Sequence, residues 1–352
     1  MRIAQIAPLT EAVPPRLYGG IERVVSFLTE ELVSMGHEVT LFASGDSVTR
    51  AKLAAGWPRA LRFEASIRDT IAPHMVMIER VARRADEFDV VHCHLDYWPF
   101  SLFSRLNKPF LTTLHGRLDL PELAPVFRCF NSVPLVSISD AQRRPLAQVN
   151  FVKTIHHGIP EDLLTPQPVK QEYAAFLGRV SPEKGVDKAI RIAGKAGLKL
   201  KIAAKVDNAD KKYYETEIRP LIQASPWVEF IGEINDSQKP GFLSGAQALL
   251  FPIDWPEPFG LAMIESMACG TPVIAFNCGS VPEVIEHGVT GFVVDDEARA
   301  SAAIPHLGRL SRKAIRQRFE QRFTAQRMTM DYLSLYHHMA AVKVRPSLRV
   351  VT

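Results

Sequence analysis

Tyr-Ala-Ala-Phe-Leu-Gly, residues 173–178, begins a strand–helix pattern for the second time in this chain of 352 residues. The stretch is short and apolar, as expected of a buried strand, and a helical pattern follows at about residues 184–196. Alternation of buried strands with helices predicts a parallel sheet that is covered on both faces. The other strand-like stretches of this half lie at residues 199–204, 227–231, 248–252, 272–276 and 291–294.

The first half of the chain carries the same pattern. Its clearest helix spans residues 21–35, where Val25, Leu28 and Leu32 recur at helical spacing. The helical pattern stops at Gly36, a residue typical of helix ends. We therefore predict an α/β protein of two Rossmann-like, doubly wound domains with a ligand in the central cleft between them. The strand-like stretches of this half lie at residues 2–7, 38–43, 89–93, 109–114 and 133–138.

Proline residues indicate where the two domains meet. Residues 165–168, Thr-Pro-Gln-Pro, read as a linker. We predict an N-terminal domain of residues 1–165 and a C-terminal domain of residues 166–323. A helical stretch at 324–341 has no strand after it, so we expect it to pack back on the N-terminal domain. The tail at 342–352 has no predicted structure.

The composition is that of a soluble globular protein, with 47% apolar and 23% charged residues. No run reaches the roughly 18–20 apolar residues of a membrane span. The N-terminus reads as a first strand and lacks the features of a signal peptide, so we expect a cytoplasmic protein. Four scattered cysteines without a CxxC pair predict reduced, structural thiols and no zinc site. They are Cys93, Cys129, Cys269 and Cys278.

The net charge of +4 is mild, but basic residues crowd one C-terminal stretch. We interpret this stretch as a solvated helix face, with contact to anionic lipid head groups at the inner face of a membrane as the alternative. Nucleic-acid binding is disfavoured because aromatic residues do not interleave with these charges. The basic residues are Arg309, Arg312, Lys313, Arg316, Arg318 and Arg322.

Two carboxylates near a strand-to-helix loop form the most informative motif. Glu257 lies among prolines that exclude a helix before about residue 258, and Pro258 suits a helix start. Glu265 would then lie roughly two turns inside that helix. Two carboxylates placed in this way can accept hydrogen bonds from two sets of hydroxyls, which suits a polyhydroxylated ligand. The alternatives are a favourable anion at a helix N-terminus for Glu257 and an exposed helix residue for Glu265.

Two cations flank the turn after residues 173–178. Arg179 and Lys184 lie in the segment Gly-Arg-Val-Ser-Pro-Glu-Lys-Gly, residues 178–185. Fixed cations and helix amides stabilise the charge of a diphosphate leaving group without a metal. Lys205 is a further candidate for contact with the diphosphate. The alternative for these residues is ordinary surface charge.

Glu257 and Glu265, with seven residues and a Pro-Phe-Gly between them, resemble the EX7E motif of the family 4 retaining glycosyltransferases, which have the GT-B fold. The resemblance extends from Met1 to about Tyr336. It implies that Glu265 holds the donor ribose and that Glu257 lies beside the donor sugar. It also implies donor contacts along the loop and around the first C-terminal strand, by Gly178, Pro258, Phe259, Gly260 and Leu261.

Three segments of the first half resemble the same family. The stretch at 18–23, with Gly19 and Gly20, resembles the loop that touches the donor phosphate and the acceptor, although a glycine pair alone is often a tight turn. His115 ends the strand at 109–114, where a family histidine reaches the donor sugar across the cleft. We assign His94 a supporting or acceptor-side role. A metal site from His92 and His94 is the alternative by spacing.

The resemblance implies a retaining, metal-independent transferase that moves a hexose from a UDP- or GDP-sugar to a glycan, a lipid-linked saccharide or a small metabolite. It implies no cofactor beyond the nucleotide sugar, an acceptor-side N-terminal domain and a donor-binding C-terminal domain. Arg179 and Lys184 would support the leaving group, and Glu257 and His115 would position the sugar. Residues 203–208 lack the glycine-rich segment of many family members, which leaves the role of Lys205 open.

Other functions are compatible with the same architecture. A nucleotide-sugar 2-epimerase would bind the same donor and convert it without an acceptor. An inactive donor-binding partner protein would bind it without turnover. A dehydrogenase is disfavoured because no GxGxxG follows the first strand of either domain. Asp254 and Trp255, which precede Glu257, are unusual and are candidates for shaping which sugar fits.

Overall fold

The computed structural model describes residues 1–16 and 19–342, and the chain forms two compact units. The first unit comprises Met1–Ile138, Arg143–His156 and the residues from Ala325 onward. The second unit comprises Ser139–Gln142 and His157–Thr324. Tyr18 of the predicted donor loop and residues 343–352 of the predicted tail lie outside the described residues.

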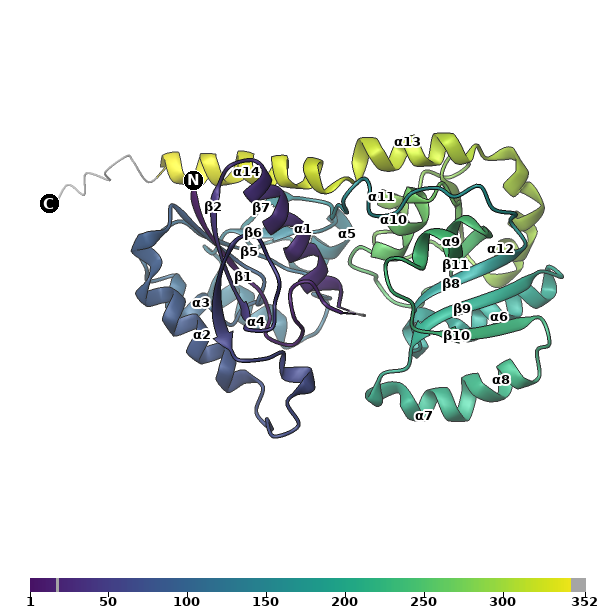
Figure 1. Cartoon of the computed structure of the whole chain (residues 1–352), viewed down its shortest axis with the longest axis horizontal. Helices are drawn as coiled ribbons and strands as arrows, with labels where there is room; N and C mark the ends of the chain where they lie inside the picture. Colours follow the sequence, from purple (N-terminus) through teal and green to yellow (C-terminus); the bar gives the residue numbers. More distant parts are fainter. Residues whose placement is uncertain (17–18, 343–352) are drawn as a thin grey trace, which may run out of the picture. The chain divides into compact units, whose positions relative to one another are not determined.

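The first unit is built on a parallel sheet of seven strands in the order β3-β2-β1-β4-β5-β6-β7 (Figure 1). The five strands predicted for this half are present, and two edge strands were missed. Both missed strands are only partly buried along most of their length, so they lack the apolar signal of the central strands. The strands are β1 (Arg2–Ile6), β2 (Glu38–Ser44), β3 (Lys52–Trp57), β4 (Val90–Cys93), β5 (Phe110–Thr113), β6 (Leu135–Ser137) and β7 (Phe151–Thr154).

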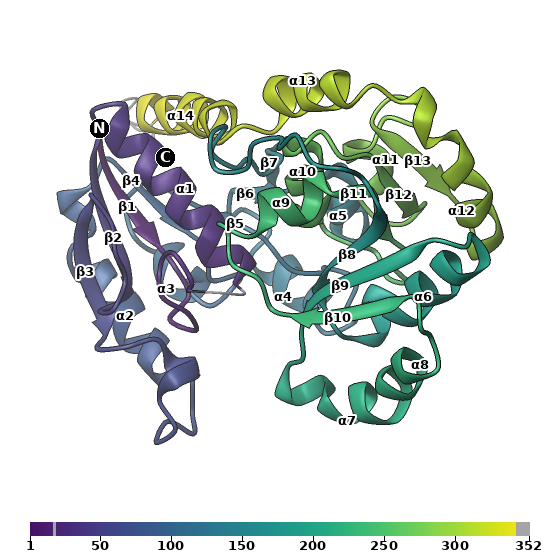
Figure 2. The same cartoon turned by 45° about the vertical axis from the view of Figure 1, so that its right-hand side comes forward.

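Helices cover both faces of this sheet because its central strands are apolar on both sides. Ala4 and Ile6 share one core cluster with Met77 of α2, whereas Ala7 and Val25 of α1 belong to another. The last helix, α14, packs on α1 and on β4 within the same unit (Figure 2). The helices of this unit are α1 (Gly20–Ser34), α2 (Ile71–Arg83), α3 (Phe100–Phe103), α4 (Leu123–Cys129) and α14 (Ala325–Val342). The short helix α5 (Asp140–Arg143) lies where the chain passes between the units, and its first three residues belong to the second unit.

The second unit has a parallel sheet of six strands in the order β10-β9-β8-β11-β12-β13, and all six were predicted. The strands are β8 (Tyr173–Arg179), β9 (Lys199–Lys205), β10 (Val228–Gly232), β11 (Ala246–Phe251), β12 (Val273–Phe276) and β13 (Gly291–Val294). The helices are α6 (Val186–Lys195), α7 (Lys211–Tyr213), α8 (Arg219–Gln223), α9 (Lys239–Ser244), α10 (Leu261–Ala268), α11 (Val281–Val284), α12 (Glu297–Ala303) and α13 (Arg312–Arg322).

The strand order of each sheet reverses at one place. The reversal lies between β1 and β4 in the first sheet and between β8 and β11 in the second. In doubly wound sheets, ligands bind outside the carboxyl ends of the strands at such a reversal. In each unit, a site is therefore expected among the residues that follow the two strands at the reversal.

Two predicted boundaries differ from the structure. The proline-rich segment near residue 166 lies inside the second unit, which begins again at His157, and the backbone N–H of Gln167 donates to Ser244 Oγ there at 2.9 Å. The predicted helix start at Pro258 is wrong, because Gly260 adopts a left-handed φ of 82° and α10 begins only at Leu261. Glu265 is consequently the fifth residue of its helix and lies about one turn inside it.

The interpretation of the C-terminal basic stretch as a solvated face is wrong for three of its arginines. Arg312 donates to the carbonyls of Ser244 and Ala246, and Arg316 donates to those of Glu161, Leu164 and Ala268. Arg322 donates to the carbonyls of Glu283 and Val284. These guanidinium groups tie α13 to the rest of the second unit. No helix within residues 1–16 and 19–342 combines the length and apolarity needed to cross a bilayer.

Candidate functional site

Charged side chains gather at the carboxyl edge of the second sheet. Lys184 follows β8, Lys205 ends β9 and Glu257 follows β11. Because these are three consecutive strands in the sheet, their ends lie at one edge. Lys184, Lys205 and Glu257 therefore share one edge of the second sheet.

Lys184 and Glu257 form an ion pair at this edge. Lys184 Nζ lies 2.5 Å from Glu257 Oε2, and both side chains are mostly buried. Trp255 Nε1 donates to the same oxygen at 2.8 Å, and its ring lies 4.9 Å from Lys184 Nζ. Two donors on one carboxylate oxygen fix the carboxylate plane, so the other oxygen, Oε1, has a defined direction.

The loop that carries Glu257 is held by the turn after β12. Gly279 has a left-handed φ of 58°, and a Cβ there would lie 2.4 Å from the backbone N and O of Glu257. The backbone N–H of Ser280 donates to the Glu257 carbonyl at 3.0 Å, and Cys278 Sγ lies 2.8 Å from the Trp255 carbonyl. Gly279 was not among the predicted site residues, because its local signal in the sequence is only a glycine shortly after a predicted strand.

The turn after β8 is held in a similar way. Gly185 has a left-handed φ of 70°, and a Cβ there would lie 2.2 Å from the Pro252 carbonyl oxygen. The backbone N–H of Asp254 also donates to the Glu183 carbonyl at 2.8 Å. The turn after β8 can therefore approach the loop after β11 closely only with glycine at residue 185. This approach brings Lys184 within reach of Glu257.

Glu265 belongs to a second, more deeply buried group of charges. Its Oε1 accepts from Lys239 Nζ at 2.6 Å, and Lys239 also lies 3.1 Å from Asp236 Oδ1. Glu265 and Lys239 are 6% and 7% exposed. A buried carboxylate is tolerated only with such compensation, so Lys239 is a necessary partner of Glu265, and it was not among the predicted site residues. The predicted alternative of an exposed helix residue is wrong.

The remaining predicted cations are paired within the second unit. Arg179 Nη2 donates to Glu183 at 2.6 Å, and Arg179 Nε lies 3.5 Å from Asp210. Lys205 Nζ lies 3.6 Å from Asp207 Oδ2. Each cation is thus pre-positioned by a nearby carboxylate.

The four predicted donor contacts after Glu257 differ in character. The Pro258 carbonyl accepts from Ser139 Oγ at 2.7 Å, and the Phe259 carbonyl accepts from Ser280 Oγ at 2.8 Å. The Phe259 ring is buried against His157, with ring centroids 4.9 Å apart. The Phe259 side chain is therefore part of the core, so a ligand could contact this residue only through its backbone. Gly260 and Leu261 start α10.

Gly178, which is also predicted to bind the donor, has open space where a side chain would lie. The nearest atom to a Cβ built there is Phe176 Cε1 at 4.0 Å, so packing within the protein does not require glycine. At Gly19 in the first unit, by contrast, packing requires glycine, because a Cβ there would lie 2.7 Å from Pro15 Cβ. Gly20 is the first residue of α1, as expected for a loop that ends at a helix N-terminus.

His94 and His115 meet at the carboxyl edge of the first sheet. His94 Nδ1 lies 2.9 Å from His115 Nε2, and His94 Nε2 lies 3.0 Å from Gln5 Oε1. An amide oxygen only accepts, so His94 Nε2 carries the proton and a neutral His94 accepts from His115 Nε2–H. Burial lowers the pKa of His115 to about 3, so its ring is neutral.

His92 belongs to a buried network behind this pair. Its Nδ1 lies 2.7 Å from the Tyr336 hydroxyl, and its Nε2 lies 2.7 Å from Thr113 Oγ1. The Tyr336 hydroxyl also accepts from Gln5 Nε2 at 3.1 Å. Both nitrogens of His92 are thus engaged by hydroxyls. The described residues contain no group of three or more His, Cys, Asp or Glu side chains placed to hold a metal ion.

Replacement of Tyr336 by phenylalanine is expected to lower the free energy of unfolding by about 1–3 kcal/mol, because His92 and Gln5 would lose a buried partner. Urea unfolding followed by circular dichroism measures this change. The control is Tyr97→Phe, since Tyr97 is 37% exposed and the same deletion should cost less than about 0.5 kcal/mol. Equal stability of the two variants would contradict a role for α14 in holding the histidine network.

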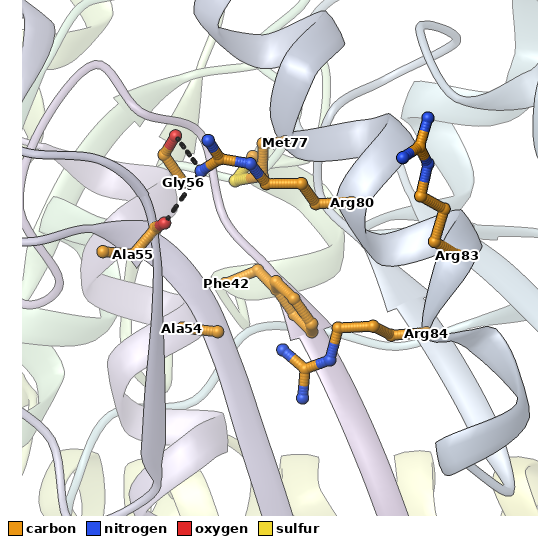
Figure 3. Close-up of a pocket in the computed structure, with 8 residues that line it drawn as sticks. All are labelled: Phe42, Ala54, Ala55, Gly56, Met77, Arg80, Arg83 and Arg84. Carbon is orange, nitrogen blue, oxygen red and sulfur yellow. Dashed lines mark hydrogen bonds between the residues drawn. The ribbon is translucent and has the colours of Figure 1, made fainter.

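A separate hollow of about 380 Å³ lies on the first unit and is lined by none of the predicted residues. Figure 3 shows Arg80, Arg83 and Arg84 around an apolar floor that includes Phe42. Arg83 and Arg84 already donate to Glu79 and Glu87, at 2.8 Å and 2.7 Å. Arg80 donates to the carbonyls of Ala55 and Gly56 at 3.5 Å. Because two of the three cations are paired with carboxylates, this hollow is a weak candidate for an anion site.

Comparisons with known proteins agree over both halves of the chain. A family model described as Glycosyltransferase Family 4 matches residues 18–163, and one described as Glycosyl transferases group 1 matches residues 165–324. An uncharacterised glycosyltransferase of Methanocaldococcus jannaschii is 25% identical over 82% of this chain and 85% of that protein.

Solved structures give the same result for the fold. Sucrose-phosphate synthase of Thermosynechococcus elongatus superposes with a TM-score of 0.81 at 20% identity, over 97% of this chain and 99% of that one. HepE of Anabaena, solved in complex with UDP-glucose, superposes with a TM-score of 0.73 at 17% identity, over 96% of this chain and 100% of that one.

Proposed function

The chain belongs to the family 4 glycosyltransferases, and on that premise we propose that it transfers a hexose with retained anomeric configuration from a UDP- or GDP-sugar to an acceptor hydroxyl. One observation supports the donor assignment above the others. The second unit holds two buried carboxylates, Glu257 and Glu265, each paired with a lysine at the carboxyl edge of one sheet. The complex of HepE with UDP-glucose supports a uridine nucleotide as the first donor to test.

The two carboxylates suit two parts of a nucleotide sugar. Glu265 would accept the hydroxyls of the ribose through the oxygen that Lys239 does not occupy. Glu257 would accept a hydroxyl of the sugar through Oε1, because Oε2 is held by Lys184 and Trp255. We also assign His115 to positioning of the sugar. This division makes both glutamates binding groups and assigns neither a proton transfer.

The cations suit the departure of the nucleoside diphosphate. The bond between the anomeric carbon and the phosphate oxygen breaks, and both electrons leave with the phosphate. Lys184 and Arg179 would stabilise that charge, so no metal is required in this proposal. The acceptor oxygen then bonds to the anomeric carbon on the same face, and its proton goes to the departing phosphate. We propose a glycan, a lipid-linked saccharide or a small metabolite as the acceptor.

Replacement of Glu265 by glutamine is expected to weaken donor binding by about 10- to 100-fold, because hydrogen bonds to a charged acceptor are lost. The wild type is first screened by thermal shift against UDP-glucose, UDP-galactose, UDP-N-acetylglucosamine, GDP-mannose and ADP-glucose, since a bound donor raises Tm by mass action. The affinity of Glu265→Gln for the selected donor is then measured by calorimetry.

Glu161→Gln is the matched control for this experiment, because Glu161 is exposed. It should bind the donor like the wild type. A wild type that gains no stability from any of the five nucleotide sugars would contradict the proposed function. Tight donor binding by both variants would leave the function standing and contradict the role of Glu265. Conversion of donor to an isomerised sugar would identify the 2-epimerase alternative.

A further inference from the structure

Trp255 precedes Glu257 by two residues, and the proposed function gives it no role. Its half-buried side chain contacts both members of the ion pair between Lys184 and Glu257. The indole Nε1–H donates to Glu257 Oε2 at 2.8 Å, and the centre of the ring lies 4.9 Å from Lys184 Nζ. One side chain therefore touches the residue assigned to the sugar and the residue assigned to the leaving group.

The backbone around Trp255 is held independently of the indole. The Trp255 carbonyl accepts from the backbone N–H of Glu257 at 2.7 Å, and Cys278 Sγ lies 2.8 Å from the same oxygen. The backbone N–H of Asp254 donates to the Glu183 carbonyl at 2.8 Å. Replacement of the indole should therefore leave the loop in place and act on the charged groups that the indole contacts.

The N–H of the indole acts on the carboxylate. An indole nitrogen is a donor only, and this one is directed at a carboxylate oxygen of the protein. Hydrogen bonds to a charged acceptor are among the strong ones, so this contact restricts the rotation of the Glu257 carboxylate. Any effect of the N–H on a bound sugar would consequently pass through Glu257.

The aromatic face of the indole acts on the ammonium. Arg179 and Lys239 are each paired with two carboxylates. Within residues 1–16 and 19–342, Lys184 is paired with one carboxylate, and the indole ring is its second partner. A ring attracts a cation through its quadrupole and adds no net charge. The charge of Lys184 is thus held in place but less compensated than that of the other two cations, which suits a diphosphate.

We propose that Trp255 is a positioning residue with two separable actions. Its N–H orients Glu257 toward the donor sugar, and its ring orders Lys184 for the diphosphate. The inference rests on the proposed function and adds a residue to the machinery of the same site. Trp255 itself takes no part in making or breaking bonds.

The test separates the two actions by substitution. Trp255→Phe keeps an aromatic face and removes the N–H, whereas Trp255→Leu removes both. The control is Trp227→Phe, because Trp227 is 37% exposed and precedes β10, at the amino edge of the same sheet. The probes are the nucleotide sugar selected by thermal shift and its own nucleoside diphosphate, which is UDP, GDP or ADP. Hydrolysis of the first gives kcat, and calorimetry gives the affinity for the second.

Trp255→Phe is expected to lower kcat by about 10- to 100-fold, the cost of a misplaced group that positions the substrate. Its affinity for the nucleoside diphosphate should stay within about twofold of the control, because Lys184 keeps its aromatic partner. Trp255→Leu should in addition bind the nucleoside diphosphate about 3- to 10-fold more weakly, because the ammonium must then be ordered upon binding.

Equal kcat values for Trp255→Phe and Trp227→Phe would overturn the inference. A direct stacking contact between the indole and the sugar would give this result, since phenylalanine can still stack. Loss of nucleoside diphosphate affinity in Trp255→Phe as large as its loss of kcat would also overturn the inference, because it would indicate general disruption of the site. Failure of the wild type to bind any of the five nucleotide sugars would instead overturn the proposed function.

Discussion

Replacement of Lys184 by methionine is expected to lower the rate of sugar transfer by about 100- to 1,000-fold, the range seen when one preorganised group that stabilises transition-state charge is removed. Methionine keeps most of the apolar stem and removes the ammonium, so the turn at Gly185 should keep its shape. Glu257 would also lose one of the two donors that fix its Oε2. Steady-state kinetics on donor hydrolysis and transfer measure the effect, which should fall mainly on kcat.

Lys188→Met is the matched control, because Lys188 lies four residues further along the chain and also forms an ion pair. Its Nζ lies 2.6 Å from Asp254 Oδ2, but the Asp254 side chain is 70% exposed. Exposed pairs contribute about 0–1 kcal/mol, so this variant should retain most of its activity. Rates for Lys184→Met within about threefold of the control would contradict the assignment of Lys184 to the leaving group.

Replacement of Gly279 by alanine is expected to reduce transfer by about 100-fold or more although residue 279 bears no chemistry. The new Cβ would lie 2.4 Å from two backbone atoms of Glu257, so the loop that carries this carboxylate must move. A displacement of about 1 Å at a substrate-positioning residue can cost about 100-fold in rate. We also expect a loss of unfolding free energy above about 2 kcal/mol, from backbone strain and collision together.

Gly288→Ala is the control that separates backbone strain from the steric collision of the new Cβ. Gly288 also has a left-handed φ, of 77°, but no atom lies within 4 Å of a Cβ built there. Alanine at 288 should therefore cost only about 1 kcal/mol and leave the kinetics unchanged. Chemical denaturation and initial rates on both variants provide the comparison. If Gly279→Ala matched Gly288→Ala in activity, the turn after β12 would have no part in positioning Glu257.

The predicted fold class, GT-B with two doubly wound domains, is confirmed. It could be predicted because the alternation of apolar strands and helices repeats along the chain. Central strands such as β11 are apolar on both faces and were readily predicted. The edge strand β3 contains Gly56 and little buried surface, which hid it. The helix start at Pro258 was wrong because the sequence gives no direct sign that Gly260 adopts a left-handed conformation.

The candidate site was predictable only in part. Glu257, Glu265, Arg179 and Lys184 belong to local motifs, so the order of residues along the chain is enough to single them out. Lys239 lies 26 residues from its partner Glu265 and belongs to no recognised motif. The pair of Lys239 with Glu265 exists only after folding.

The most direct test of the central claim is proton NMR of the selected nucleotide sugar incubated with the enzyme and EDTA, first without acceptor and then with a probe sugar. A retaining, metal-independent glycosyltransferase predicts release of the nucleoside diphosphate, and the first sugar to appear should be the same anomer as in the donor. Transfer to the probe should keep that configuration. The opposite anomer, an isomerised sugar, or turnover that stops when EDTA is added would contradict the account.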